Sequence, residues 1–591
     1  MPKRSSNRRK EMSSLHERLD QLEEKLGQFE QQFLPATGEK PRTLWREIRS
    51  GIDQVIHEHR SPYIRKGIQL PAILIATPEI VSLPHNMGNL ANVVTTGDGG
   101  GLADISAALV KELDTQGLNV HVALPEYQHL FEAFADISHK NYLMLKEDIN
   151  DQNRVHLIED DIFMGAKRVY GDAAPKLDLI DLRRANAFQR GILSRLFPLL
   201  KRHNKHILVH CNDWMTGIIP AAAKRHGIQS LMTFHNIFTQ YQWPKGLHKH
   251  SINIEPFWRF CYFRDHPAKN GDTYEGNYET NGVDFMTTGL YAADYINTVS
   301  PTFLKEIVEG FFIEHDIIPG HMREVIRTRY REGSATGILN APAMTADPRI
   351  DPLLVQRYWH EKTEQDDVAD ILAGKRANKV YLQKALGLAV EPDTPLFFWP
   401  SRIAKPQKGF ELLLHLIPHL MEKFQMQIAV VANGDNSLIP TIQHYQHCFP
   451  GRISYHAFDR TLSQIAKAGS DFILMPSLYE PCGIPQVEAP RYGTLPIVRR
   501  TGGLADTIEP LSNNGLMGNG FMFQDFIPSG FWFGIQRAIS FYKRKEEFRL
   551  RVMKRIMRES FDKFNIQKTA KKYIEVYENI FRKTDPNIRV I

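Results

Sequence analysis

Two cations in one short segment of the sequence could neutralise a diphosphate. Arg402 and Lys408 lie in residues 401–409, between an apolar stretch over residues 396–399 and a helical pattern that begins near Phe410. A guanidinium group binds phosphate oxygens as a planar fork, and a lysine adds a point charge beside the same helix start. Together they could stabilise a diphosphate leaving group without a metal ion. Either cation taken alone would more often be a solvated surface residue.

Two glycine-rich turns could bring backbone amides close to phosphate oxygens. Each turn precedes a stretch with helical periodicity, and a helix N-terminus favours negative charge. The residues that we assign to these turns are Gly100 and Gly101 in the first and Thr501, Gly502, Gly503 and Leu504 in the second. A glycine-rich turn is more often only a turn, and the first one does not match the dinucleotide-binding pattern. A nicotinamide-dependent oxidoreductase is therefore a poor candidate.

A third candidate segment carries two carboxylates. Glu480 and Glu488 lie eight residues apart in a loop that enters a helix, and Cys482 and Gly483 lie between them. Both carboxylates could reach one ligand near the helix start. Most glutamates at a helix start are capping or solvated residues, so the pattern alone does not identify a nucleophile.

The elements that must position these residues form two series of alternating apolar strands and helices. The expected strands are residues 72–76, 120–124, 207–209 and 231–233 in the first series, and 396–399, 428–432, 472–475 and 495–498 in the second. This alternation predicts an α/β fold with two doubly wound, Rossmann-like domains, each built on a parallel sheet. Ligands of open parallel sheets bind at the carboxyl ends of the strands, so we expect the site in the cleft between the domains.

The overall composition is that of a large soluble enzyme. With 591 residues, of which 42% are hydrophobic, the chain can bury two cores. The net charge of +6 is small for this length and no apolar run is long enough to span a bilayer, so neither nucleic-acid nor membrane binding is expected. The four cysteines lack paired metal-ligand spacing, and nothing at the N-terminus resembles a signal peptide. We expect a cytoplasmic protein without a metal or cofactor.

The N-terminal segment has a pattern of its own. Apolar residues recur there at alternating spacings of four and three, at Leu15, Leu19, Leu22, Leu26, Phe29 and Phe33. This spacing predicts an amphipathic helix of about three heptads. Self-association through this helix and packing on its own chain are equally favoured.

Longer motifs in the sequence resemble those of the bacterial glycogen synthases and plant starch synthases. The most specific matches are residues 481–483 and 492–506, with others at residues 213–214, 235–236, 299–302 and 337–340. The resemblance covers residues 72–580 and implies the GT-B fold, in which two Rossmann-like domains face each other across a cleft. It also implies a retaining glycosyltransferase that uses a nucleotide-sugar donor.

The resemblance implies roles for individual residues. Arg402 and Lys408 match the family's diphosphate-binding pair, and Glu480 matches the acidic residue beside the transferred glucose. His235 matches a histidine near the anomeric centre, and Asp213 matches an aspartate in the pocket for acceptor and donor. The amides of residues 501–504 match those around the distal phosphate.

Several positions depart from the family pattern, most of them in the first domain. The departing residues are Asp98 in place of a lysine, Asn212, Met215, Asp284, Thr287 and Ala343, together with Glu488 in place of a frequent tyrosine. An acidic side chain at position 98 would repel a diphosphate. Donor binding is therefore better supported than the identity of the acceptor.

These observations lead to one expected function and an expected domain plan. We expect transfer of glucose from ADP-glucose to the non-reducing 4-hydroxyl of an α-1,4-glucan. Residues 1–70 would form an extension, 71–300 the acceptor-side domain, 301–560 the donor-side domain, and 561–591 a helix that packs back on the first domain. The alternatives are a catalytically weak relative that binds glucan or nucleotide sugar, and a transferase with a different donor or acceptor.

Overall fold

The computed structural model describes residues 64–65, 68–97, 101–147, 153–170, 179–264, 266–269, 271–343, 345–359 and 364–591. Three features of the sequence analysis lie outside these residues: the expected N-terminal helix, Gly100, and the departure at Asp98. An antiparallel pair formed by β1 (Ile64–Arg65) and β2 (Ile68–Gln69) begins the described part of the chain.

The first domain is built on a seven-stranded parallel sheet in the order β13-β12-β7-β6-β3-β4-β5. Its strands are β3 (Ala72–Ala76), β4 (Asn119–Pro125), β5 (Val155–Ile158), β6 (Ile207–Asn212), β7 (Gln229–Phe234), β12 (Tyr295–Thr298) and β13 (Ala335–Gly337). The central strands β3 and β6 are buried along their whole length, which explains their nearly continuous apolar character.

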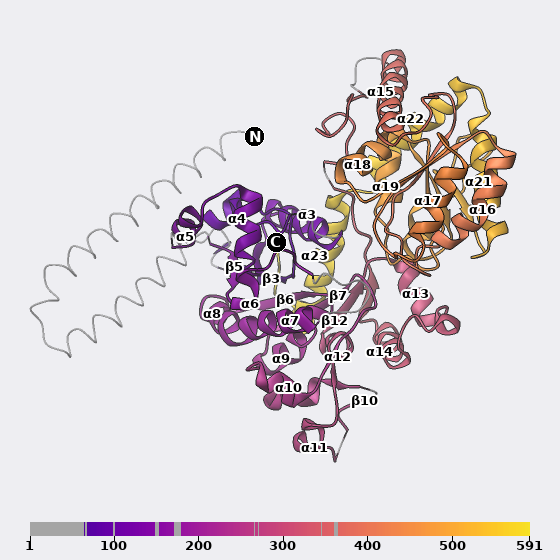
Figure 1. Ribbon diagram of the computed structural model, residues 1–591. Coiled ribbons are helices and arrows are strands. Elements are labelled where there is room, and N and C mark those ends of the chain that lie inside the picture. Colours follow the sequence, from indigo (N-terminus) through magenta and orange to yellow (C-terminus); the bar gives the residue numbers. More distant parts are fainter. Residues whose placement is uncertain are drawn as a thin grey trace, which may run out of the picture.

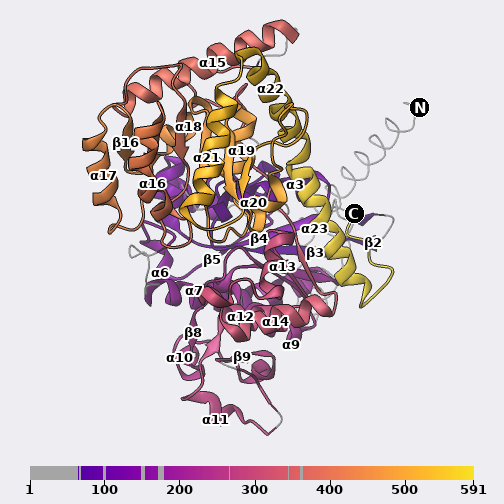
Figure 2. The ribbon, with the colours of Figure 1, turned by 90° about the vertical axis from the view of Figure 1, so that its right-hand side faces the viewer.

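Helices cover both faces of this sheet. They are α3 (Gly101–Thr115), α4 (Gln128–Ala135), α5 (His139–Glu147), α6 (Asp161–Met164), α7 (Leu179–Gly191), α8 (Phe197–His203), α9 (Ile219–His226), α12 (Phe285–Ala292), α13 (Pro301–Glu309) and α14 (Gly320–Arg331). In Figures 1 and 2, α3 lies on one side of the sheet, and α7, α9 and α12 lie on the other. The prediction of a doubly wound domain is correct for this part of the chain.

A small lobe projects from the first domain. It contains α10 (Pro244–Lys249), α11 (Tyr274–Tyr278) and a four-stranded antiparallel sheet of β8 (Tyr241–Gln242), β9 (Tyr262–Phe263), β10 (His266–Pro267) and β11 (Val283–Asp284). Figure 1 shows β10 and α11 at the end of the molecule away from the second domain. Within the described residues, no helix combines the length and the apolar composition that a membrane span requires.

The second domain contains a six-stranded parallel sheet in the order β16-β15-β14-β17-β18-β19. Its strands are β14 (Leu396–Trp399), β15 (Gln427–Val431), β16 (Ile453–His456), β17 (Phe472–Met475), β18 (Leu495–Arg499) and β19 (Phe521–Phe523). Alternate residues of β14 join separate cores: Phe397 packs with α16 (Phe410–Lys423) and α21 (Pro528–Tyr542), and Phe398 packs with α15 (Glu364–Ala385) and α18 (Arg460–Gly469). The remaining helices are α17 (Ile439–Cys448), α19 (Pro485–Glu488), α20 (Gly502–Thr507), α22 (Glu546–Lys563) and α23 (Ile566–Arg582).

The boundary between the domains lies later than the expected division after residue 300. β13 pairs with β12 in parallel register, with Ile296 opposite Ala335, so α13 and α14 belong to a crossover within the first sheet. The sequence analysis misplaced this boundary because it did not identify the short strand β13.

The last helix returns to the first domain. Tyr573 and Tyr577 of α23 are buried in the core of the first domain, where their hydroxyl groups contact the side chains of Asn297 and His210. Figure 2 shows α23 running from the end of α22 down to the first domain. Three connections therefore join the two domains: the chain segment after β13, the returning helix α23, and the contact between α13 and α20.

Candidate functional site

On the second domain, the loop after β14 meets the loop after β17. Lys408 Nζ lies 2.6 Å from Glu480 Oε2, and these side chains are only 12% and 6% exposed. Ser477 Oγ donates a second hydrogen bond to the same carboxylate oxygen at 3.0 Å. The loops approach closely because Gly409 has φ +70° and a Cβ atom there would lie 2.4 Å from the carbonyl oxygen of Pro476.

Arg402 lies in the same cluster but is exposed. Its Nη2 donates to Oε1 of Gln407 at 2.8 Å, which holds the guanidinium group over its own loop. Burial raises the pKa of Tyr479, and the nearby charge of Arg402 opposes that effect. The structure thus brings Arg402, Lys408 and Glu480 together at the carboxyl ends of two neighbouring strands.

Glu488 and Cys482 do not join this charged cluster through their side chains. Glu488 Oε2 lies 2.6 Å from Lys467 Nζ of α18, and both side chains are largely buried. Burial raises the pKa of the Cys482 thiol to about 12, so the thiol is protonated at neutral pH. Gly483 has φ +73° and turns the chain into α19.

The second glycine-rich turn, before α20, is buried and its amides already have partners. Gly502 N–H donates to Glu306 Oε2 at 3.0 Å, and Gly503 N–H donates to the carbonyl oxygen of Glu480 at 3.0 Å. Leu504 N–H donates to the carbonyl oxygen of Thr501. A phosphate group could reach the amide of Gly502 only by displacing the carboxylate of Glu306.

On the first domain, Asp213 and His235 follow the ends of β6 and β7. Asp213 has φ +57° and ψ 177°, a strained backbone for a residue with a side chain. Its Oδ1 accepts from the backbone N–H of His235 at 2.7 Å, and its Oδ2 accepts from Nδ2 of Asn236 at 3.2 Å. The two strand ends are therefore held together by one carboxylate.

Burial sets the charge state of this pair. It raises the pKa of Asp213 to about 7, and the negative charge of Glu79 adds to that effect. It lowers the pKa of His235 to about 4, so the imidazole is neutral at pH 7, and its Nε2 donates to Oδ1 of Asn212 at 3.0 Å. The sequence analysis missed Glu79, a buried carboxylate just after β3, although its place after an expected strand end was a usable signal.

The remaining predicted positions lie around these clusters. Gly101 is the exposed first residue of α3, a helix of 15 residues. Asp284, one of the departures, is fully buried and caps α12 by accepting from Thr287 N–H at 2.9 Å, and it pairs with His321 Nε2 at 2.8 Å. Among the described residues, no group of three or more His, Cys, Asp or Glu side chains is placed to hold a metal ion.

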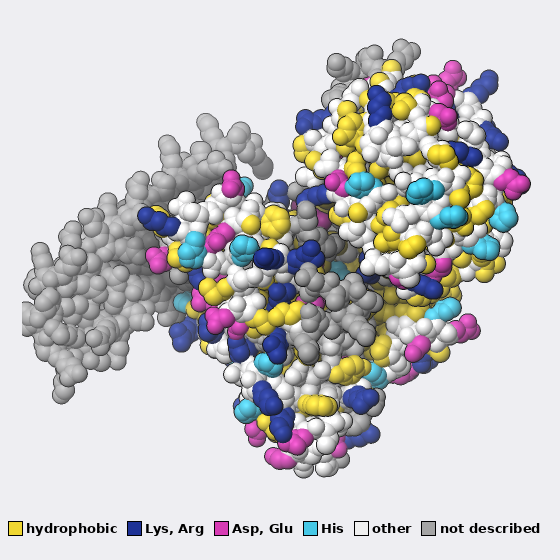
Figure 3. Space-filling model, viewed as in Figure 1, with side chains coloured by type: hydrophobic (Ala, Val, Ile, Leu, Met, Phe, Trp, Pro, Cys, Tyr) yellow, Lys and Arg dark blue, Asp and Glu magenta, His cyan; other side chains and the backbone are white. Residues whose placement is uncertain are grey.

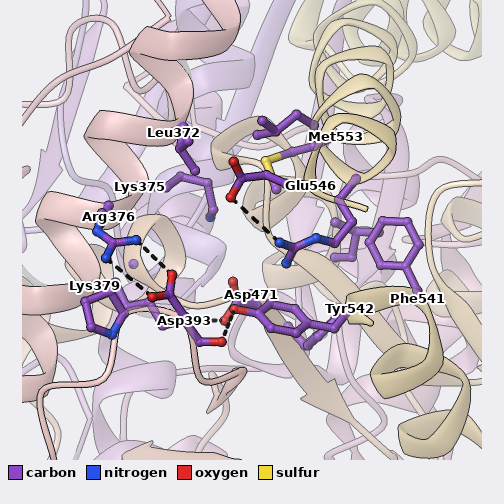
Figure 4. A pocket seen from close by; sticks show the side chains of 16 residues that line it. Leu372, Lys375, Arg376, Lys379, Asp393, Asp471, Phe541, Tyr542, Glu546 and Met553 are labelled. Atoms are coloured by element: carbon purple, nitrogen blue, oxygen red, sulfur yellow. Dashed lines mark hydrogen bonds and ion pairs between the residues drawn. The ribbon is translucent and has the colours of Figure 1, made fainter. Parts of the chain in front are cut away.

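The second domain also contains a cavity that is separate from the candidate site. Figure 3 shows several Lys and Arg side chains near the place where the two domains meet. A cavity of about 70 Å³ lies elsewhere, between α15 and α22 (Figure 4). There Arg376 pairs with Asp393 at 2.8 Å, Lys379 pairs with Asp471 at 2.7 Å, and Lys375 donates to three backbone carbonyls. These charges are satisfied by the domain itself.

Two family models match the chain. Residues 72–318 match the model described as "Starch synthase catalytic domain", and residues 388–547 match "Glycosyl transferases group 1". The first segment covers most of the first sheet domain and includes Asp213 and His235, and the second covers most of the second sheet domain and includes Arg402, Lys408 and Glu480.

Curated relatives match along most of the chain. A glycogen synthase of Exiguobacterium sibiricum is 31% identical over 515 residues, which cover 82% of this chain and 97% of the relative. A glycogen synthase of Clostridioides difficile is 32% identical over 508 residues, which cover 81% and 96%. Among solved structures, the catalytic domain of starch synthase IV from Arabidopsis thaliana, bound to ADP and acarbose, has a TM-score of 0.65. Its identity is 24%, and the match covers 86% of this chain and 99% of that one.

Proposed function

Because this chain belongs to the glycogen synthase family, and is therefore a glucosyltransferase with the GT-B fold, we propose that it transfers glucose from ADP-glucose to an α-1,4-glucan. The acceptor atom is the 4-hydroxyl oxygen at the non-reducing end of the glucan. The configuration at the anomeric carbon is retained.

The observation that supports this proposal best is the contact of Lys408 with Glu480, 2.6 Å apart at the carboxyl ends of β14 and β17. An ammonium group with three N–H donors can bind Glu480 and a phosphate oxygen of the donor together. Arg402, on the same loop, adds a second fixed positive charge. Both cations then stabilise the negative charge that develops on the leaving diphosphate as the bond to the sugar breaks.

The first domain supplies the groups that orient the sugar. His235 is neutral at pH 7 and lies at the end of β7, so it can hydrogen-bond the sugar near the anomeric carbon without adding a charge. Asp213 holds the backbone of His235 and the side chain of Asn236. Glu480 faces the same sugar from the second domain and stabilises the positive charge that develops on the sugar ring in the transition state.

The other predicted donor contacts have weaker support. Gly100, Gly101, Cys482, Gly483 and Glu488 are proposed to line the donor site around the phosphates and the nucleoside. A contact of the phosphate with residues 501–504 requires Glu306 to leave the amide of Gly502.

Radiolabelled nucleotide sugars test this proposal directly. The purified full-length protein is incubated with glycogen and with ADP-glucose, UDP-glucose or GDP-glucose, and radioactivity in the precipitated glucan is measured. We expect incorporation from ADP-glucose, and β-amylase, which cleaves α-1,4 linkages from the non-reducing ends, should release the incorporated label. Incorporation only from another donor would refute the assignment of ADP-glucose, and no incorporation from any donor would refute the proposed reaction.

A second candidate function is a binding protein without transferase activity. It is motivated by the departures in the first domain, where Asp284 and Thr287 stand at the positions of a usual asparagine and lysine. Asp284 pairs there with His321. Such a protein would be retained on a glycogen column and would incorporate no glucose.

A further inference from the structure

Two helices from different domains cap each other in this structure. α13 of the first domain packs against α20 of the second, and each of them begins with backbone N–H groups that have no acceptor within their own helix. In both helices, a carboxylate of the opposite helix supplies that acceptor. We call the six residues that make these contacts, namely Ser300, Thr302, Glu306, Thr501, Gly502 and Asp506, the reciprocal caps.

The start of α13 is capped from the second domain. Asp506 Oδ2 accepts from the backbone N–H of Thr302 at 3.1 Å and from the hydroxyl group of Ser300, while its Oδ1 accepts from the hydroxyl group of Thr302. Ser300 also accepts from Phe303 N–H at 2.9 Å, as an ordinary N-cap residue does. One carboxylate thus accepts three hydrogen bonds from the other domain.

The start of α20 is capped from the first domain. Glu306 Oε2 accepts from the backbone N–H of Gly502 at 3.0 Å and from the hydroxyl group of Thr501 at 3.1 Å. Thr501 and Gly502 are fully buried or nearly so, and the backbone N–H of Gly502 has no solvent to replace this acceptor. Burial raises the pKa of Glu306 to about 7, and the hydrogen bonds from Gly502 and Thr501 oppose that shift. When Glu306 is ionised it is a charged acceptor, which forms the stronger class of hydrogen bond.

The reciprocal caps are connected to Glu480 through the backbone. A Cβ atom on Gly502 would lie 1.9 Å from the carbonyl oxygen of Glu480 and 3.5 Å from Cβ of Phe303, so the turn is wedged between the Glu480 loop and α13. Gly503 N–H donates to the same carbonyl oxygen at 3.0 Å. Nearby, the rings of Phe312 and Tyr479 meet edge to face at 6.0 Å, which adds a second contact between the domains.

We propose that the reciprocal caps are the pivot between the two domains, and that Glu306 and Asp506 are positioning residues that act on glucosyl transfer through the Glu480 loop. The pivot fixes where Glu480 stands relative to His235 and Asp213 when the cleft is closed. The amide of Gly502 then serves the contact between the domains and not the phosphate of the donor. The kinetic part of this inference rests on the proposed function; the structural part does not.

Four variants test the kinetic part: Glu306→Ala, Asp506→Ala, Glu306→Gln and Glu309→Ala. Removing either carboxylate should lower kcat about 10- to 100-fold, because a small displacement of a catalytic group is enough to slow the reaction, and should leave the KM for the donor within about twofold. Glu306→Gln retains an acceptor for Gly502 and Thr501 and should recover a large part of kcat. Glu309→Ala is the control, since Glu309 lies on the same helix with a side chain that is 62% exposed.

The opposite model makes a different kinetic prediction. If Glu306 only blocked a phosphate site on Gly502, Glu306→Ala would lower the donor KM and leave kcat unchanged, and that result would overturn the pivot. An unchanged kcat and KM in both alanine variants would overturn it as well.

Small-angle X-ray scattering of the full chain without ligand tests the structural part and does not depend on activity. Asp506→Ala should increase the radius of gyration relative to the native protein and to Glu309→Ala, because the domains lose their fixed orientation. Identical scattering curves for all three proteins would refute the pivot even if glucose transfer is confirmed. If an alanine variant does not fold, Glu306→Gln and Asp506→Asn, which keep an acceptor, are compared with Glu309→Ala in the same two measurements.

Discussion

Replacing Lys408 by methionine keeps the length of the side chain and removes its charge and its hydrogen bonds. The ammonium group lies 2.6 Å from Glu480 Oε2 in a pair that is 12% and 6% exposed. At this separation the Coulomb attraction is about 6 kcal/mol for an effective dielectric constant of about 20, and the cost of desolvating both groups offsets much of it. Deleting one partner leaves Glu480 buried, with Ser477 as the remaining donor to its carboxylate among the described residues, a loss of about 3–5 kcal/mol for a pair of this kind.

The effect on catalysis can be separated from this effect on stability. Lys408 is also proposed to stabilise the leaving diphosphate, and removal of one such donor lowers kcat about 100- to 1,000-fold. Initial rates of nucleoside diphosphate release are measured at saturating donor and glycogen, at a temperature where urea denaturation shows both proteins to be folded. Lys405→Met is the control, because Lys405 is an exposed lysine of the same loop. A folded Lys408→Met protein that retains more than about a tenth of the native kcat would contradict the proposed role.

Two further predictions concern buried charged groups. Lys375→Met removes the ammonium group that donates to the carbonyl oxygens of Ala468, Ser470 and Tyr492 and to the hydroxyl group of Thr494. Urea denaturation should show that the free energy of unfolding falls by roughly 2–4 kcal/mol. Lys384→Met, on the same helix, is the control and should leave the free energy of unfolding unchanged. Burial raises the pKa of Asp213 from 3.8 to about 7, so the folded protein binds a proton more tightly than the unfolded chain and loses stability as the pH rises from about 4 to 7. Asp213→Asn lacks this titration. The difference in the free energy of unfolding, variant minus native protein, should therefore increase by roughly 2–4 kcal/mol between pH 5 and pH 8. An equal difference at both pH values would show that Asp213 is already ionised at pH 5.

The sequence was sufficient to predict the elements of the candidate site. Arg402, Lys408 and Glu480 were identified from their places after expected strands, and those strands form as β14 and β17. Apolar runs of four to seven residues fold as buried parallel strands because both faces of each sheet are covered by helices. His235 and Asp213 were identified from the resemblance, and they follow the ends of β7 and β6.

Other features depend on contacts between segments that are far apart in the chain. The carboxylate of Glu488, a residue proposed to line the donor site, pairs with Lys467, because α18 packs next to the turn that carries Glu488. The sequence alone did not indicate this partner. The expected boundary after residue 300 was wrong for a similar reason. The three residues of β13 carry too weak a pattern to be identified without the neighbouring strand β12.

The sequence by itself therefore determined the two parallel-sheet domains, the family, and the candidate site residues at strand ends, because local apolar periodicity and short motifs encode them. Only the tertiary structure decided that β14 and β17 are neighbours, so that Lys408 meets Glu480. It also decided that Glu306 and Asp506 cap each other's helices, through contacts between residues up to 206 positions apart in the chain. The physical reason is that a carboxylate or an ammonium group takes the partner that packing brings within about 3 Å, and packing between distant segments leaves no periodic signal in the sequence.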